Sequence, residues 1–180
     1  MRPGMKLAIL LIGGILTWSS IFFFACSSNN PKARAKAVAE KSLMACVDCP
    51  ETVRIKAVSD VDSVFGREYV TLDESMAIAT SMLKITSYVM EQTDDMENID
   101  FSDTELAGLM ERQMSAMAAM RGLTGSDDGE SGNPKKFSGW KVKIEYEAKT
   151  SDGKPYRSEY WFILDKDAGC VVKSFEIPLL

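Results

Sequence analysis

The sequence predicts an α+β fold in which helices pack on a C-terminal antiparallel sheet. The middle of the chain holds two helical patterns, and each begins with a capping box, Thr71-x-x-Glu74 and Ser102-x-x-Glu105. Three strand-like segments, joined by turn sequences, follow between residues 140 and 177, and the first of them alternates apolar and polar residues. Because helices come first and consecutive strands come last, we expect a three-strand meander with helices packed on it, joined by one short strand from earlier in the chain.

The N-terminus carries an apolar run behind a short basic start. Arg2 and Lys6 precede the run 7–25, which holds no ionisable residue, and Cys26 follows it. This order is typical of a secretory signal peptide. The run, at about 19 residues, is also close to the roughly 20 that span a bilayer as a helix. An uncleaved helix in the inner membrane is therefore an alternative.

Phe23-Phe24-Ala25-Cys26 resembles the cleavage box of bacterial lipoprotein precursors, in which a small residue precedes a cysteine that is lipidated. The resemblance implies cleavage before Cys26 and a lipid anchor on Cys26. Ser27 stands where inner-membrane lipoproteins often have aspartate, so the resemblance also implies the outer membrane of a bacterial cell envelope. Cleavage by ordinary signal peptidase within Ala25-Cys26-Ser27 is a further alternative, and it would release a soluble domain.

These boundaries give a signal peptide over 1–25, a tether over 26–32 and a single α+β domain over 33–180. Without Arg2 and Lys6 the 21 basic residues become 19 against 26 acidic ones, so the mature chain carries a net charge of −7. This charge argues against nucleic acid, and against an anionic membrane surface, as a main partner. The chain has no histidine, which excludes Ser-His-Asp and Cys-His catalysis and histidine zinc ligation. We predict no catalytic residue, metal or cofactor.

The first helix is expected to begin at Asn30 as N-cap, with Pro31 in its first turn, and to end near Cys46. Its predicted apolar face consists of Val38, Ala39, Leu43 and Ala45. Alternating residues predict a first strand over 52–59, and the segment 60–63 is expected to turn the chain.

The second and third helices are predicted over 73–91 and 103–121. The acidic segment 91–105 between them is expected to be a solvated loop, since it lacks the glycine and ligand spacing of a calcium loop. The segment 124–136 is rich in Gly, Ser and Asp, which predicts a mobile surface loop. The predicted inward faces are Ile78, Met82, Ile85 and Val89 on the second helix, and Leu106, Met110, Met114 and Met117 on the third. The methionines could supply thioethers to Cu(I), but core packing or an adaptable binding surface accounts for the same spacing.

The three C-terminal strands are predicted over 140–148, 156–164 and 170–177, with hairpin turns at 151–154 and 165–169. The strand 156–164 is apolar on both faces, so we expect it to be central in the sheet.

This order of elements resembles the cystatin-like and nuclear-transport-factor-like domains of small secreted lipoproteins. The segments that suggest the resemblance are Gly139-Trp140-Lys141-Val142 and Trp161-Phe162-Ile163-Leu164-Asp165. The resemblance extends over about residues 33–180 and carries no catalytic motif. It implies a binding or inhibitory role, and occasionally an enzymatic one.

Cys46 and Cys49 have the C-x-x-C spacing of a redox or disulfide pair, or of half a metal site. They lie at the end of a predicted helix rather than at its start, and no second pair completes a zinc site, so a local disulfide or two incidental thiols is the preferred interpretation. Cys170 begins a predicted strand and is expected to be buried as a small apolar residue.

Aromatic residues are concentrated in the predicted sheet. Trp161 lies on the strand face opposite Phe162 and is expected to point outward. The candidate surface for a ligand or partner consists of Trp161, Trp140, Tyr146 and Tyr160. The resulting hypothesis is a membrane-tethered, non-enzymatic lipoprotein that binds a protein or small ligand. The alternatives are a ligand-cavity enzyme of the same fold, and a thiol or metal protein that uses Cys46 and Cys49.

Overall fold

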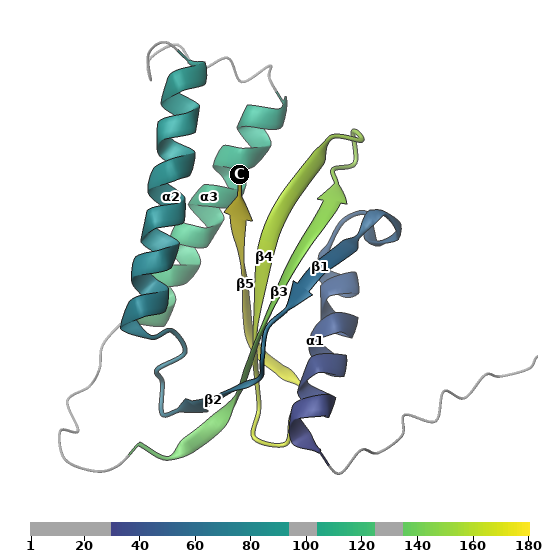
Figure 1. Cartoon of the computed structure of the whole chain (residues 1–180), viewed down its shortest axis with the longest axis vertical. Coiled ribbons are helices and arrows are strands. Elements are labelled where there is room, and N and C mark those ends of the chain that lie inside the picture. The colour runs from purple at the N-terminus through teal and green to yellow at the C-terminus, as the bar shows by residue number, and fades with distance from the viewer. Residues whose placement is uncertain (1–29, 94–103, 125–134) are drawn as a thin grey trace, which may run out of the picture.

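A computed structural model of the chain describes residues 30–93, 104–124 and 135–180, and these form three layers (Figure 1). Helix α1 (Pro31–Cys46) covers one face of an antiparallel sheet, and helices α2 (Leu72–Gln92) and α3 (Thr104–Thr124) cover part of the other face. The predicted α+β class is confirmed. The predicted signal peptide, Cys26 and Ser102 lie outside the described residues.

The sheet is antiparallel throughout and is built on two long inner strands. The order is β1-β3-β4-β5, and β2 also pairs with β3, so β1 and β2 share one border of β3. The strands are β1 (Arg54–Val58), β2 (Asp62–Phe65), β3 (Phe137–Lys149), β4 (Pro155–Leu164) and β5 (Val171–Leu179). A 3₁₀ turn, η1 (Pro50–Thr52), leads into β1. The predicted central position of β4 is confirmed, because β4 is hydrogen-bonded to β3 on one side and to β5 on the other.

The segment 60–63 does not simply turn the chain, as its sequence predicted. Asp62 and Ser63 pair with Lys141 and Trp140 of β3, and Val64 is almost fully buried. Its partner strand lies more than 70 residues further along the chain, so the local sequence carries no sign of the pairing.

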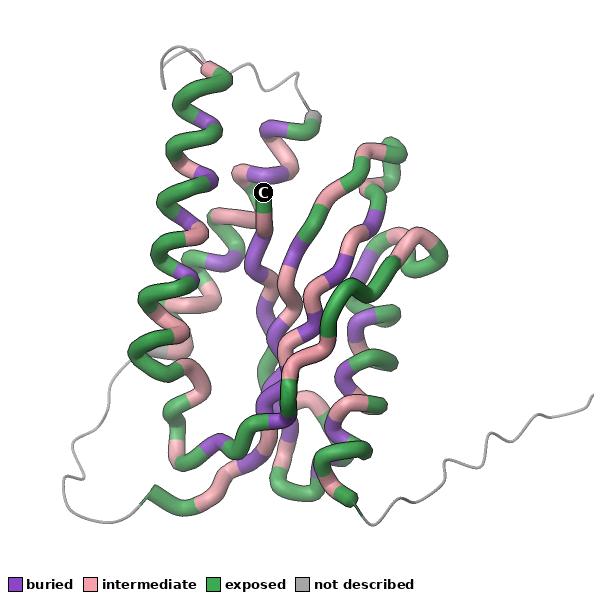
Figure 2. Tube along the Cα trace, viewed as in Figure 1, coloured by how far each residue is buried: buried purple, intermediate pink, exposed green. Residues whose placement is uncertain are grey.

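The residues that α1 and the sheet turn toward each other are buried (Figure 2). The α1 face consists of Ala35, Ala39 and Leu43, all fully buried, whereas Ala45, which was predicted to face inward, is exposed. Two alanines one turn apart bring the helix axis close to the strands. The sheet side of this core contains Val142, Ile144, Tyr146, Ala148, Phe162 and Leu164.

The second core lies between the α2 and α3 pair and the opposite face of β4 and β5. Thr71 forms the predicted capping box with Glu74: the Glu74 amide donates to Thr71 Oγ1 (3.2 Å) and the Thr71 amide to Glu74 Oε2 (2.9 Å). The predicted inward face of α2 is confirmed. On α3 the prediction is wrong for Met114 and Met117, which are exposed. The buried set is Ile78, Met82, Ile85, Val89, Leu106, Leu109, Ala116, Trp161, Phe175 and Ile177.

Among the described helices, none has the length and apolar character needed to cross a bilayer.

Candidate functional site

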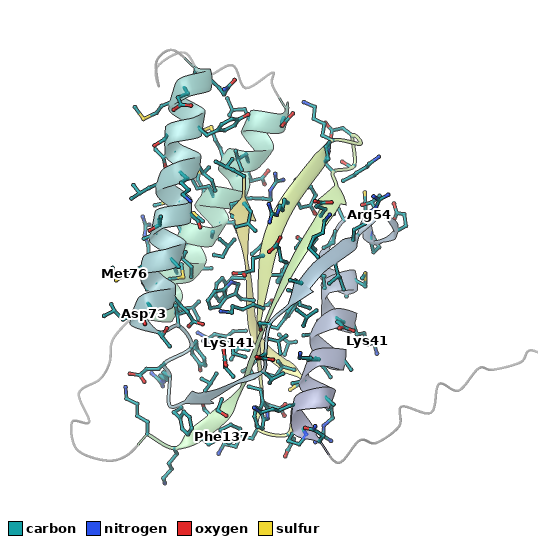
Figure 3. The ribbon with its side chains drawn as sticks, viewed as in Figure 1. Lys41, Arg54, Asp73, Met76, Phe137 and Lys141 are labelled. Carbon is teal, nitrogen blue, oxygen red and sulfur yellow. The ribbon has the colours of Figure 1, made fainter. Side chains whose placement is uncertain are left out.

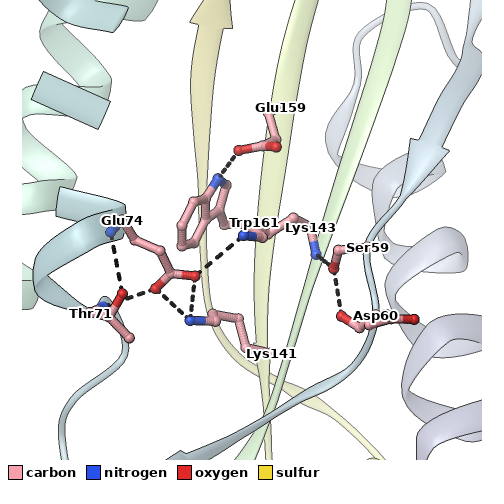
Figure 4. A network of polar contacts seen from close by, with 8 residues as sticks. All are labelled: Ser59, Asp60, Thr71, Glu74, Lys141, Lys143, Glu159 and Trp161. Atoms are coloured by element: carbon pink, nitrogen blue, oxygen red, sulfur yellow. Dashed lines mark hydrogen bonds and ion pairs between the residues drawn. The ribbon is translucent and has the colours of Figure 1, made fainter. Parts of the chain in front are cut away.

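A network of charged groups lies where the first turn of α2 meets β3 (Figure 4). The Lys141 ammonium donates to both carboxylate oxygens of Glu74, at 2.7 and 2.6 Å. Lys143 reaches the same carboxylate at 3.3 Å. Only 5 % of the Lys141 side chain is exposed, so one carboxylate of α2 neutralises a cation buried on the sheet.

Trp161 forms the wall of this network. The Lys143 and Lys141 ammonium groups lie 4.9 and 5.5 Å from the centre of the indole ring, within the range of cation–π attraction. The indole N–H donates to Glu159 at 2.6 Å. Trp161 is only 2 % exposed, so the α2 and α3 layer covers the face that was predicted to be open.

The charged groups of this network are paired with one another: both lysines contact the carboxylate of Glu74. Burial by itself raises the pKa of Glu74, but the hydrogen bonds from Lys141 and from the Thr71 amide, with the charges of Lys141 and Lys143, lower it overall. The arrangement therefore fastens α2 to the sheet, and we assign it a structural role.

A cluster of tyrosines lies on the other face, beside the end of α1. The Tyr146 hydroxyl donates to Glu176 at 2.9 Å, and the Tyr146 ring lies edge-on to that of Tyr156 with centres 6.0 Å apart. Burial raises the pKa values of Tyr146, Tyr156 and Tyr160, and the Glu176 charge adds to each increase. The hydroxyls stay neutral at physiological pH, so they serve as hydrogen-bonding groups and not as bases.

Two buried polar atoms at this face have no hydrogen-bond partner, Ser158 Oγ and Arg112 Nε. Ser158 lies on β4 between Tyr156 and Tyr160, and the Arg112 guanidinium lies 4.4 Å from the centre of the Tyr156 ring. Neither of the two hollows that border the α2 and α3 layer is lined by Ser158 or Arg112, and we assign these two atoms no ligand.

The structure does not bring the four predicted aromatic residues into one surface. Trp140, Tyr146 and Tyr160 are on the α1 side of the sheet, whereas Trp161 is on the α2 and α3 side. Tyr146 and Trp161 are buried, and only Trp140 and Tyr160 are partly exposed. Strand alternation placed Trp161 on the correct face, but it could not show that helices cover that face.

The thiols of the described residues are all free. Cys46 ends α1 and is exposed, Cys49 is partly exposed, and Cys170 is exposed rather than buried as predicted. Cys170 belongs to the β4–β5 turn, in which Asp165 Oδ1 accepts hydrogen bonds from the amides of Gly169 (2.7 Å) and Cys170 (3.1 Å). The redox or disulfide role of Cys46 and Cys49 stays a prediction. No three His, Cys, Asp or Glu side chains of the described segments gather as a metal site would require.

Two small hollows border the α2 and α3 layer. One, of about 220 Å³, lies between α3 and β5 beside Ala119 and Phe175. The other, of about 260 Å³, lies between Lys84 of α2 and Arg157 and Leu179 of the sheet. Both are smaller than the roughly 300 Å³ at which ligand pockets begin, and neither is lined by a carboxylate side chain.

Among the described residues, an exposed apolar stripe runs along α2 and is formed by Leu72, Met76, Leu83 and Met90. These side chains are 77, 62, 67 and 53 % exposed, and Met76 points away from the sheet (Figure 3). Sequence reasoning found the inward stripe of α2 and missed this second one. The signal was present, because all four positions share one helical face that differs from the inward face.

The comparisons with known proteins give no relative for this chain: no family model matches it, and no curated protein or solved structure does either.

Proposed function

We propose that this protein is a membrane-tethered, non-enzymatic lipoprotein that binds a protein partner through the outer face of α2. The observation that carries the proposal is the exposed stripe of Leu72, Met76, Leu83 and Met90. Large apolar side chains that line up over one face of an element mark interaction sites, whereas scattered ones need no explanation.

The energy of the stripe supports binding. Fully burying a Leu or Met side chain contributes about 1.5–3 kcal/mol, and all four stripe residues are more than half exposed. A partner that covers them removes this surface from water, which favours binding. The translational and rotational freedom lost on association opposes it. The inward stripe of the same helix already fixes α2 to the sheet, so the docking element is rigid before binding.

The N-terminal sequence supports the proposed tether. The basic start, the apolar run and Cys26 favour lipidation of Cys26 and attachment to the outer membrane. The cystatin-like and nuclear-transport-factor-like resemblance agrees with a binding domain of this kind. A membrane-attached domain meets its partners at the membrane surface, where a modest affinity is sufficient.

Photo-crosslinking in cells tests the proposal. The full chain carries a photoreactive amino acid either at Met76 or at Lys41, which is exposed on α1 (Figure 3). We expect adducts from Met76 in the membrane fraction and none from Lys41. Cys26→Ala should move both the protein and its adducts to the soluble fraction.

Absence of adducts from every probe on the α2 stripe would refute the docking face. Membrane attachment that survives Cys26→Ala would refute the lipid anchor and leave the uncleaved helix as the means of attachment.

A further inference from the structure

We infer that the partner of the α2 stripe is α2 of a second copy of this chain, packed antiparallel about a twofold axis. The inference rests on the proposed function, because it names the occupant of that docking face. It follows from the spacing of the stripe, the sizes of its side chains, the mostly uncharged residues beside it and the area that the contact would bury.

The spacing is that of a helix–helix seam. The stripe and the two smaller residues between its members follow one another at intervals of four, three, four, three and four residues: Leu72, Met76, Ala79, Leu83, Thr86 and Met90. This is the heptad pattern of positions d and a, and it keeps one line of residues facing a second helix. A span of 18 residues corresponds to about 27 Å of helix.

Side-chain sizes favour the antiparallel arrangement. When the axis passes near residue 81, Leu83 of one copy lies opposite Ala79 of the other, Met76 lies opposite Thr86, and Leu72 lies opposite Met90. Each small residue then receives a large one, as close packing requires. A parallel pair would set Ala79 against Ala79 and Thr86 against Thr86, which leaves gaps along the seam.

Most residues that flank the seam are uncharged. Ser75, Thr80 and Ser87 border it, and the acidic residues Asp73 and Glu91 lie at its two ends, beside Leu72 and Met90. The Thr86 hydroxyl donates to Met82 O (3.0 Å) and accepts from Gln113 (2.8 Å). The Thr86 hydroxyl therefore keeps its hydrogen bonds when the second copy covers it.

Helix α3 widens the contact surface. Gln113 bridges to α2, and Met117 follows it by one helical turn on the same side of α3. Met117 and its neighbour Met114 are exposed. A face about 27 Å long and two helix diameters wide covers on the order of 500 Å² per copy, so a four-helix contact buries about 1,000 Å², the lower bound for a specific interface. A common membrane tether raises the effective concentration enough for such an interface.

Purified full chain in phosphatidylethanolamine and phosphatidylglycerol vesicles, with no other protein present, tests the inference. Photoreactive residues replace Leu72 or Leu83, and mass spectrometry identifies the crosslinked peptide. We expect a product of twice the chain mass in which position 72 is joined to the region of Met90, and position 83 to the region of Ala79. Leu83→Glu should reduce the yield at position 72 by about tenfold or more.

Val172→Glu is the matched control, because it makes the same kind of change at an exposed apolar residue on β5, and it should leave the yield unchanged. Joining of position 72 to position 72 would overturn the antiparallel register. Absence of a dimer in vesicles, together with adducts of Met76 to another protein in cells, would overturn the second copy as partner and leave the proposed function standing.

Discussion

Lys141 places a positive charge inside the protein, and a single carboxylate balances it. The Lys141 ammonium lies between Glu74 and the ring of Trp161, and Lys143 approaches the same carboxylate from the more exposed side. Glu74 at the same time completes the capping box at the start of α2 with Thr71. The Glu74 side chain therefore caps the N-terminus of α2 and also binds that helix to the sheet.

Replacing Glu74 by alanine should destabilise the protein by about 3–5 kcal/mol, because it leaves the Lys141 charge buried and unpaired. Unfolding by guanidinium chloride measures this change. The effect should depend on pH. The lowered pKa of Glu74 means that its contribution is fully present above the ordinary value of 4.5 and is lost as pH falls through the lower folded-state pKa. The difference between wild type and Glu74→Ala should therefore shrink in strongly acidic solution.

Glu147→Ala is the control for this prediction, since it breaks the ion pair of Lys56 and Glu147 (2.9 Å) in which both side chains are more than 40 % exposed. A change within about 1 kcal/mol is expected there. Equal losses in the two variants would show that the burial of Lys141 carries no special cost.

At the scale of the elements, Gly139 decides how closely β3 can lie to the end of β4. A Cβ atom at this position would lie 1.9 Å from the carbonyl oxygen of Leu164, which is backbone and cannot move aside as a flexible side chain would. The residue before Trp140 must therefore be glycine for the long β3–β4 pairing to continue to its end.

Gly139→Ala should unfold the protein or destabilise it by more than about 3 kcal/mol, a loss typical of overpacked or severely strained sites. Gly108→Ala is the matched substitution in α3, where the added Cβ meets only the end of the Arg112 side chain at 3.6 Å. There we expect a gain of about 0.5–1 kcal/mol from the lower entropy of the unfolded chain and the better helix propensity of alanine. Thermal unfolding measures the stability of both variants. A Gly139→Ala protein as stable as the wild type would contradict the close approach of Gly139 to the Leu164 carbonyl.

The elements that sequence predicted well are those whose signals are local. The capping box at Thr71, the inward stripe of α2 and the alternation in 140–148 each lie within a few residues, and each predicted element is found. The strand β2 was missed because only Val64 of its four residues is buried and its partner is distant in sequence. The site was predicted less well for the same reason: the meeting of Glu74, Lys141 and Trp161 depends on how whole layers pack.

For the whole molecule, the sheet separates two cores of different construction. The α1 core lies over β3 and β4, which are bonded on both sides. The α2 and α3 layer buries one stripe of each helix against β4 and β5 and leaves a second stripe of α2 in solvent. Figure 1 shows this helix pair at the side of the sheet, with the ends of both helices extending past the strands.

The two layers should therefore open at different free energies, which native-state hydrogen exchange can resolve. Ile85→Ala removes a nearly fully buried side chain from the second core and should speed exchange in α2 and α3, with little change in β3. Leu43→Ala, in the α1 core, should reduce protection in β3 and β4 as well, by about 2–5 kcal/mol. If Ile85→Ala instead lowers protection equally in all three layers, the molecule opens as one unit. The outer stripe of α2 would then be available to a partner only in the fully folded protein.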